Sequence, residues 1–170
     1  MIKLYVLLFL VFLISACDAQ KQNAQQIPSA TEFNPLTSTT IRSLQGQQVY
    51  VPVYKNLYLS EKGHVPLTTV LSIRNTSLTE SIIIAKVDYY DTNGKLLKSF
   101  LNGPFSLSKM ASKDFVISSD DLTGGTGANF VVKWDSEKKI STPIIEALMY
   151  GTNGTHSYSF TSRGQEIEAH

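Results

Sequence analysis

The 170-residue sequence predicts an all-β fold, a single antiparallel β-sandwich that follows a signal peptide and a flexible tether. Apolar residues alternate with polar ones over most of residues 47–168, turn residues separate these runs at short intervals, and no run has helical spacing. A parallel sheet would need crossovers of about a dozen residues or more, which the chain cannot provide. We therefore expect one immunoglobulin-like domain of about eight or nine strands.

The expected strands follow in chain order. Residues 48–54 (QVYVPVY) place three valines on one face, since alternate residues of a strand point the same way. Residues 68–75 and 81–90 form the next two, and Asn93-Gly94 then joins a hairpin through a tight two-residue turn, because both residues tolerate positive φ. The hairpin ends near residue 100. The remaining strands are expected at residues 103–109, 113–118, 129–135, 143–151 and 156–164.

Residues 1–16 have the three parts of a secretory signal: a cation at Lys3, an apolar run over residues 4–14, and two small residues. The run is shorter than the roughly 20 residues that cross a bilayer. The sequence ISAC at residues 14–17 has the form of a bacterial lipobox, in which the cysteine becomes the acylated N-terminus. We predict a lipid anchor on Cys17; an ordinary signal with a chance cysteine nearby is the alternative.

The lipobox predicts a protein of the bacterial cell envelope, with its domain on the periplasmic or other extracytoplasmic side. The choice between inner and outer membrane stays open. Residues 17–46 are rich in Gln, Ala, Ser and Thr, a composition that buries too little apolar surface to order a chain, and they predict a flexible tether. The β-sandwich domain is then expected over residues 47–168.

Two counts exclude whole classes of function. Cys17 is the only cysteine of the sequence, so an anchored chain has no thiol left for a disulfide, a nucleophile or a metal site. Removal of residues 1–16 takes away Lys3 and no acid, which leaves 14 basic and 14 acidic residues. Nucleic-acid binders carry a basic stripe to neutralise phosphates, and no such stripe is present. We expect no nucleic-acid partner.

Six motifs, in this order, resemble a known family: GQQVYVPVY, LSIRNTS, VDYYDTNGKLL, GGTGANFVVKW, PIIEALMYG and FTSRGQEI. The chain is similar over about residues 46–167 to the bacterial envelope proteins catalogued as domain of unknown function 3124. The resemblance implies a compact envelope domain, often behind a signal peptide or lipobox. It implies no catalytic residues.

The stretch DDLTGGTGAN at residues 120–129 is the first candidate site. Its glycines free backbone N–H groups to face a ligand, and its two acids offer carboxylates to a calcium ion. Phosphate-binding loops open a helix, whereas a strand follows here, so a tight loop with glycines at positive φ is the leading interpretation. The candidate residues are Asp120, Asp121, Gly125 and Asn129.

Metal and catalytic signatures are weak elsewhere. His64 and His156 lie in expected loops without ligand spacing to another His, Asp or Glu, and no nucleophile elbow occurs. We expect no metal, no cofactor and no catalytic residue.

Glu146 shares a strand face with three large apolar residues, Ile144, Leu148 and Tyr150. If that face points inward, the carboxylate is buried and needs a partner or a raised pKa. Arg163 and Arg74 are the candidate partners. A solvent-facing Glu146, or one in a satisfied ion pair, is the alternative.

Tyr50 and Tyr54 flank Pro52 on one strand face. A proline cannot donate to a sheet ladder, so this strand is expected at an edge, where a partner's strand can add. Exposed tyrosines can also stack on a sugar or a peptide, or they can simply cover their own sheet.

These features predict a non-enzymatic, membrane-anchored module that binds another envelope component, either a protein or a glycan. The alternative is a small-molecule or ion-binding protein, or a hydrolase, that uses the loop at residues 120–129.

Overall fold

The computed structural model describes residues 44–169. The signal peptide, Cys17 and nearly all of the predicted tether lie outside these residues. The described part folds into twelve β-strands without a helix, so it contains no membrane-spanning helix. The strands are β1 (Gln45–Pro52), β2 (Asn56–Tyr58), β3 (His64–Pro66), β4 (Thr68–Arg74), β5 (Ile82–Tyr90), β6 (Leu96–Ser99), β7 (Phe105–Leu107), β8 (Ser112–Ile117), β9 (Asn129–Ser136), β10 (Ile144–Asn153), β11 (His156–Arg163) and β12 (Gln165–Ala169).

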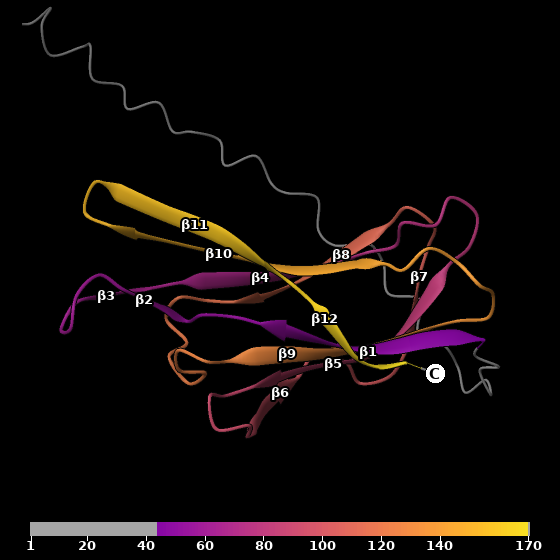
Figure 1. The fold of residues 1–170 in the computed structure, drawn as a ribbon, viewed down its shortest axis with the longest axis horizontal. Coiled ribbons are helices and arrows are strands. Elements are labelled where there is room, and N and C mark those ends of the chain that lie inside the picture. Colours follow the sequence, from indigo (N-terminus) through magenta and orange to yellow (C-terminus); the bar gives the residue numbers. More distant parts are fainter. Residues whose placement is uncertain (1–43, 170) are drawn as a thin grey trace, which may run out of the picture. The chain divides into compact units, whose positions relative to one another are not determined.

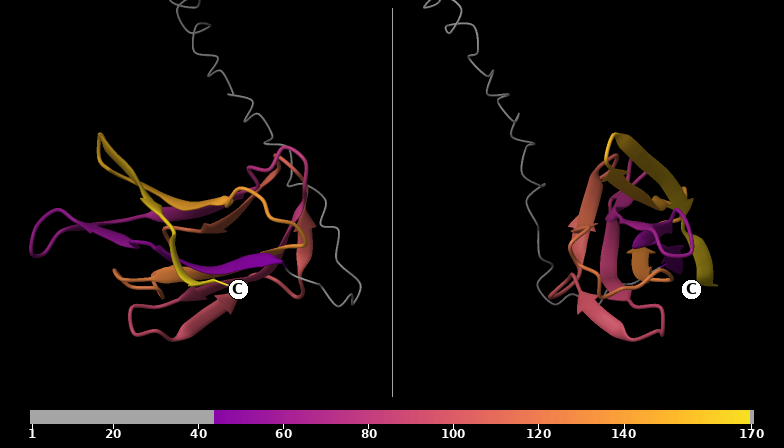
Figure 2. Two further views of the ribbon diagram at one scale, coloured as in Figure 1. Left: turned by 45° about the vertical axis from the view of Figure 1, so that its right-hand side comes forward. Right: turned by 90° about the vertical axis from the view of Figure 1, so that its left-hand side faces the viewer.

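Two antiparallel sheets face each other, as Figures 1 and 2 show. The first has the order β12-β1-β9-β5-β6, with β7 also paired to β5, and the second has the order β11-β10-β4-β8. The strands β2 and β3 form a separate ribbon. The predicted all-β antiparallel sandwich is confirmed.

The structure has twelve strands where eight or nine were expected. The three additional strands are β2, β3 and β12. The first two have three residues each, too few for an alternating pattern to be visible. The sequence of β12, QEIEA, carries the polar residues of an exposed strand with Ile167 as its one large apolar side chain.

Alternation along the strands builds the core between the sheets. In β9, Phe130, Val132 and Trp134 point inward and are fully buried. They face residues of the second sheet such as Leu71 of β4 and Met149 of β10, which are also fully buried. The Trp134 indole N–H donates to the Gln47 side-chain oxygen at 3.2 Å, so even this large ring has a polar partner.

The strand that carries Pro52 is not an edge strand, contrary to the prediction. β1 lies between β12 and β9, and residues Gln47 to Tyr50 pair on both sides. Pro52 pairs with Asn129 of β9 and lies beyond the last residue that β12 reaches. A proline is tolerated at this position because β12 does not pair with it, so no hydrogen bond on that side of β1 requires the missing N–H.

The β5–β6 hairpin forms as predicted, but not through a two-residue turn. Its loop runs from Asp91 to Lys95, and the Gly94 N–H donates to the Asp91 carbonyl at 3.0 Å. Gly94 has a φ of 78°, whereas Asn93 does not adopt positive φ. The Asp91 carboxylate accepts from the backbone N–H groups of Asn93 and Lys95, which favours the longer loop.

The sandwich has two distinct ends. β1 begins at one end, and the β2–β3 ribbon and the tip of the β10–β11 hairpin project from the other (Figure 1). We call the latter the distal end. The loop that precedes β9 also reaches it, since β9 runs antiparallel to β1.

Candidate functional site

Glu146 points outward, which agrees with the solvent-facing alternative, and the hypothesis of a buried carboxylate is not supported. Its neighbours Ile145 and Ala147 are buried and face the core, whereas Glu146 is partly exposed on the opposite face of β10. It lies opposite Arg163 of β11 in the strand register. No ion pair joins these two side chains within the described part of the chain, and Arg74 lies opposite Ile144 instead.

The same outer face carries a contiguous group of apolar side chains, which we call the outer-face patch. Leu148 lies opposite Val70, and Val70 lies opposite Val116, so the three form one row across β10, β4 and β8. Tyr150 follows Leu148 on the same face of β10. Leu148 is 40% exposed, Tyr150 45% and Val116 54%. The patch is completed by Leu122, at 58% exposure, which lines a groove together with Tyr150.

This groove, of about 560 Å³, lies at the distal end, and we call it the distal groove. Asp120 and Tyr150 both line it, so the groove contains one sequence-predicted candidate and one residue of the outer-face patch. The remaining groove residues come from the ends of β3, β4 and β10 and from the loop before β9. They are Pro66, Thr68, Ser119, Leu122, Gly151 and Thr152.

A buried lysine, Lys55, holds the base of the loop that carries Asp120. Its side chain is fully buried, and its ammonium donates to the carbonyls of Leu67 and Ser118, each at 2.7 Å. Burial lowers the pKa of Lys55, an effect that the nearby Asp121 and Asp120 carboxylates oppose. Sequence reasoning missed this residue, although it continues the inward-facing series of Val49, Val51 and Val53.

The glycine loop is held by its own hydrogen bonds. The Thr123 N–H and hydroxyl both donate to Asp121, which lowers the pKa of that carboxyl. The Gly127 N–H donates to the Thr92 hydroxyl at 2.9 Å. Gly125 has the predicted positive φ, 68°. The N–H groups of Thr123 and Gly127 are therefore used inside the protein and are not available to an anion.

Two further residues of the loop, Asn129 and Gly124, are buried within the fold. Asn129 is buried as the first residue of β9, between β1 and β5. Gly124 packs against the Tyr89 hydroxyl, which burial keeps protonated by raising its pKa to about 12. Among residues 44–169, no three His, Cys, Asp or Glu side chains gather as metal ligands.

Tyr50 and Tyr54 lie in different surroundings. Tyr50 is half-buried within β1 and pairs with Gln165 of β12. Tyr54 lies beyond the end of β1, and its exposed ring packs edge-on against Phe160 of β11, with 5.9 Å between ring centroids. The rings of the two tyrosines make no contact with each other within the described part of the chain.

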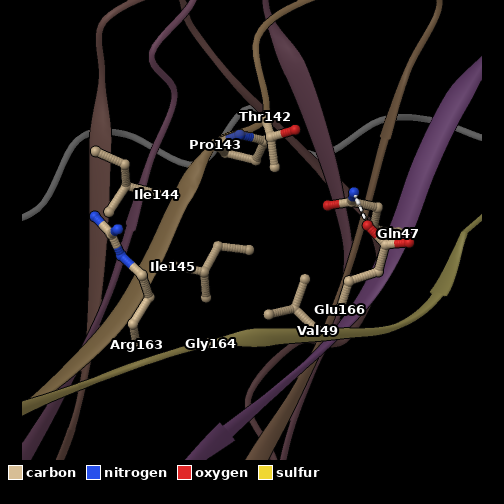
Figure 3. A pocket seen from close by; sticks show the side chains of 9 residues that line it. All are labelled: Gln47, Val49, Thr142, Pro143, Ile144, Ile145, Arg163, Gly164 and Glu166. Carbon is tan, nitrogen blue, oxygen red and sulfur yellow. Dashed lines mark hydrogen bonds between the residues drawn. The ribbon is translucent and has the colours of Figure 1, made fainter.

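A second hollow, of about 370 Å³, lies where the chain crosses from β11 in the second sheet to β12 in the first. We call it the crossover pocket (Figure 3). Arg163 lies on one side of it, and Gln47 and Glu166 lie on the other, joined by a side-chain hydrogen bond. The remaining residues are Val49, Thr142, Pro143, Ile144, Ile145 and Gly164.

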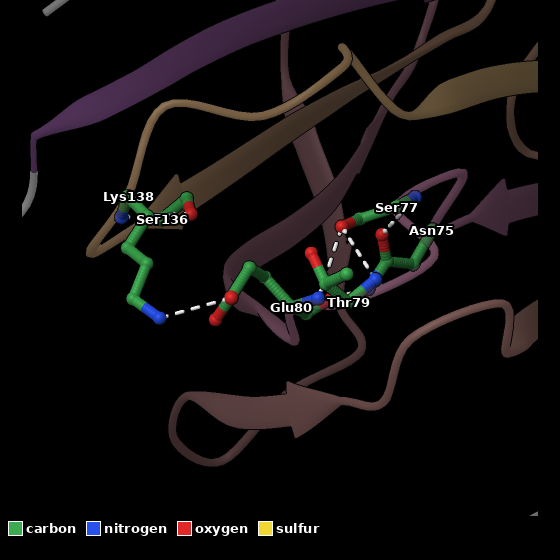
Figure 4. A network of polar contacts seen from close by, with 6 residues as sticks. All are labelled: Asn75, Ser77, Thr79, Glu80, Ser136 and Lys138. Carbon is green, nitrogen blue, oxygen red and sulfur yellow. Dashed lines mark hydrogen bonds and ion pairs between the residues drawn. The ribbon is translucent and has the colours of Figure 1, made fainter.

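A network of polar contacts fixes the turn after β4, next to this pocket (Figure 4). The Asn75 side-chain oxygen accepts from the Ser77 N–H at 2.9 Å, and its amide donates to the Glu80 carbonyl at 2.8 Å. Lys138 closes the network with an ion pair to Glu80 at 2.9 Å. The Thr76 hydroxyl donates to the Thr142 carbonyl, so the same turn supports one wall of the crossover pocket.

Comparison with known proteins gives a family without an activity. No curated protein matches the chain. A solved structure described as "Crystal Structure of Thermotoga maritima 1070" aligns with 14% identity and a TM-score of 0.40, over 70% of this chain and 92% of that one. The family model described as "Protein of unknown function (DUF3124)" matches residues 46–167, from β1 into β12. The chain therefore belongs to the DUF3124 family of proteins of unknown function.

Proposed function

We propose that this protein is a lipid-anchored, non-enzymatic binding module of the bacterial cell envelope, which holds a partner protein on its outer-face patch. Cys17 supplies the anchor, and the domain lies on the extracytoplasmic side of the membrane. The predicted tether gives the domain reach from the membrane surface.

The outer-face patch is the observation that carries the proposal. Four side chains that are each 40% exposed or more lie together with Val70 on one sheet face and its adjoining loop. Scattered exposed apolar residues are ordinary, but a contiguous patch with a polar rim marks an interaction surface. The rim is present, since Glu146 and Asp114 lie in the next row across the same strands.

The composition of the patch favours a protein over a glycan. Sugars bind mainly through stacking on aromatic rings and hydrogen bonds, whereas the patch has one ring, Tyr150, and four aliphatic side chains. The aliphatic row fits the apolar side chains of another protein. Asp120, which lines the distal groove, adds one carboxylate that favours a cationic side chain of that partner.

Cys17→Ala tests the anchor. The variant should leave the membrane fraction almost completely, because the apolar run at residues 4–14 is too short to hold the chain in a bilayer and the acyl chains supply the attachment. Membrane fractionation of native cells measures this. A variant that fractionates with membranes as the unmodified chain does would contradict the anchor.

A photo-crosslinking amino acid at position 148, in the full-length protein in its native cells, tests the patch. We expect one recurrent protein to be attached, because Leu148 lies at the centre of the patch. The matched control is position 96, where Leu96 has a similar exposure of 46% but lies on β6 of the other sheet.

A second substitution separates specific docking from chance contact. Val116→Lys places a charge in the same apolar row and should abolish the crosslink from position 148, whereas Leu96→Lys should leave it unchanged. A crosslink that survives Val116→Lys, or equal crosslinking from positions 148 and 96, would overturn the proposal. If only glycan were attached, the partner of the patch would be a sugar and not a protein.

A further inference from the structure

We infer that the end of the domain at which β1 begins docks on the lipid surface of the membrane. The site is a pair of loops, the turn after β4 (residues 75–81) and the turn between β7 and β8 (residues 108–111), which we call the proximal tip. The inference rests on the proposed lipid anchor. It gives the anchored domain a preferred orientation, with the distal groove directed away from the membrane.

The strand registers place the proximal tip at the end of the sandwich where the chain enters β1. Asp135 of β9 lies opposite Gly46, near the start of β1, and opposite Ile83, near the start of β5. The turn after β4 leads into β5, and Leu107, the last residue of β7, pairs with Ile82. Both loops therefore lie at the end opposite the distal end, beside β7 and β8 in Figure 1.

The three most exposed large apolar side chains among residues 44–169 all lie at this end. Leu78 of the first loop is 74% exposed, Met110 of the second loop 63%, and Leu44, directly before β1, 66%. Single exposed apolar residues are ordinary, but a group of them at one end of a domain marks a contact surface. This surface is separate from the outer-face patch, which none of the three residues belongs to.

Hydrogen bonds join the two loops of the proximal tip. The Met110 N–H donates to the Ser77 carbonyl at 3.2 Å, and the Asn75 N–H donates to the Ala111 carbonyl at 2.9 Å. The amide of the buried Asn75 side chain also donates to the Ser108 carbonyl at 3.1 Å. The polar network of Figure 4 holds the first loop in addition. The exposed side chains therefore stand on fixed loops, which need no further ordering when they meet a surface.

Met110 occupies a backbone position that favours glycine. It is the third residue of a turn in which the Ala111 N–H donates to the Ser108 carbonyl at 3.1 Å, and its φ is 59°. Glycine is the usual residue at such a position, and Met110 is the only other residue type with positive φ among residues 44–169. A large apolar side chain stays exposed here despite the backbone strain, which points to a function outside the fold.

The chemistry of the proximal tip and its place in the chain favour a lipid surface as the partner. Lys109 is exposed next to Met110 and forms no ion pair within the described part of the chain. At a membrane interface, apolar side chains enter the headgroup boundary while a neighbouring ammonium meets anionic headgroups. The contact can be weak, because a random-coil tether of the predicted length keeps the domain within roughly 30 Å of its anchor and so raises the effective concentration.

Fluorescence quenching by nitroxide-labelled lipids tests the contact. The full-length lipidated protein is placed on vesicles of phosphatidylcholine and phosphatidylglycerol, with a fluorophore on Leu78→Cys. This thiol is unique, because Cys17 is the only natural cysteine and carries the acyl chain. Strong quenching is expected at position 78. The matched control is Leu96→Cys, because Leu96 is also exposed but lies on β6, opposite Tyr90 and toward the distal end.

Two variants assign the parts of the proximal tip. Met110→Gly removes the side chain and suits the positive φ, so it should reduce quenching at position 78 about twofold or more without lowering the melting temperature. Lys109→Gln should reduce quenching on vesicles with phosphatidylglycerol and leave it unchanged on phosphatidylcholine alone, because only the former are anionic. The control is Leu122→Ser, at the distal groove, which should leave quenching unchanged.

Vesicle flotation separates this inference from the anchor on which it rests. A chain that does not float with the vesicles overturns the anchor, and the docking with it. A chain that floats but shows equal quenching at positions 78 and 96 overturns the docking alone. Quenching at position 78 that is unchanged in Met110→Gly, or reduced equally in Leu122→Ser, also overturns it, because the contact would then not depend on the proximal tip.

Discussion

Gly124→Ala is expected to lower the free energy of unfolding by roughly 3 kcal/mol, near the upper limit for overpacking a buried site. A Cβ at this position would lie 1.8 Å from the Tyr89 hydroxyl oxygen and 2.8 Å from the ring carbon that carries it. Tyr89 cannot move away, because it is almost fully buried and packs against Phe130 with 5.1 Å between ring centroids. Urea denaturation of the full-length chain measures the change.

A second substitution shows whether this contact is the cause. Tyr89→Phe removes a buried hydroxyl that has no hydrogen-bond partner among residues 44–169, so by itself it should not destabilise the domain. In the double variant it should recover part of the loss from Gly124→Ala, because the closest clash is gone. Gly103→Ala is the control, since a Cβ there meets nothing within 4 Å. Strictly additive effects of the two substitutions would contradict this explanation.

Lys55→Met is expected to lower the free energy of unfolding by about 2–4 kcal/mol, because the buried Leu67 carbonyl and the partly buried Ser118 carbonyl lose a charged donor. The methionine fills most of the space but donates nothing. The Ser118 carbonyl begins the loop that carries Asp120 and Leu122, so the variant should also weaken crosslinking from position 148. Chemical denaturation and the crosslinking assay measure the two effects.

The pH dependence of stability gives an independent test of the buried ammonium. Its pKa in the folded state lies below the unfolded value of 10.5, so between these two values the unfolded chain binds more protons. The free energy of unfolding should therefore increase as the pH rises through this window, because the folded chain no longer holds a buried charge at Lys55. In Lys55→Met this increase should be absent. Lys133→Met, on the partly exposed face of β9, is the control. Identical pH profiles for Lys55→Met and the unmodified chain would contradict the assignment.

The sandwich was predictable because burial on one face of a strand leaves a two-residue period in the sequence. Phe130, Val132 and Trp134 show this period, and the structure buries all three. The same reasoning failed for the shortest strands, where three residues contain too little pattern. It also failed for the position of β1 within its sheet. Pro52 needs only a local gap in the pairing on one side of β1, which the end of β12 provides, and does not need an edge strand.

The candidate site was less predictable, and β10 shows why. Both faces of this strand are largely apolar, so alternation does not reveal which one is buried. The structure buries Ala147 and Met149 and leaves Leu148 and Tyr150 outside, together with Glu146. The ambiguity that left the orientation of Glu146 open therefore has the same origin as the outer-face patch. Lys55 was missed for a different reason, because two backbone carbonyls distant in sequence offset the burial of its charge.

The central position of β1 also determines how the domain meets a mechanical load. In a chain anchored as proposed, a pull between the membrane and a bound partner would enter the domain at Gln45, the first residue of β1. This strand pairs with β9 over eight residues and with β12 over four. The ladder hydrogen bonds run perpendicular to the strand, so force along its axis shears both ladders at once and does not open them one bond at a time. A load that enters at Gln45 would thus be shared by the ladders that β1 forms with β9 and with β12.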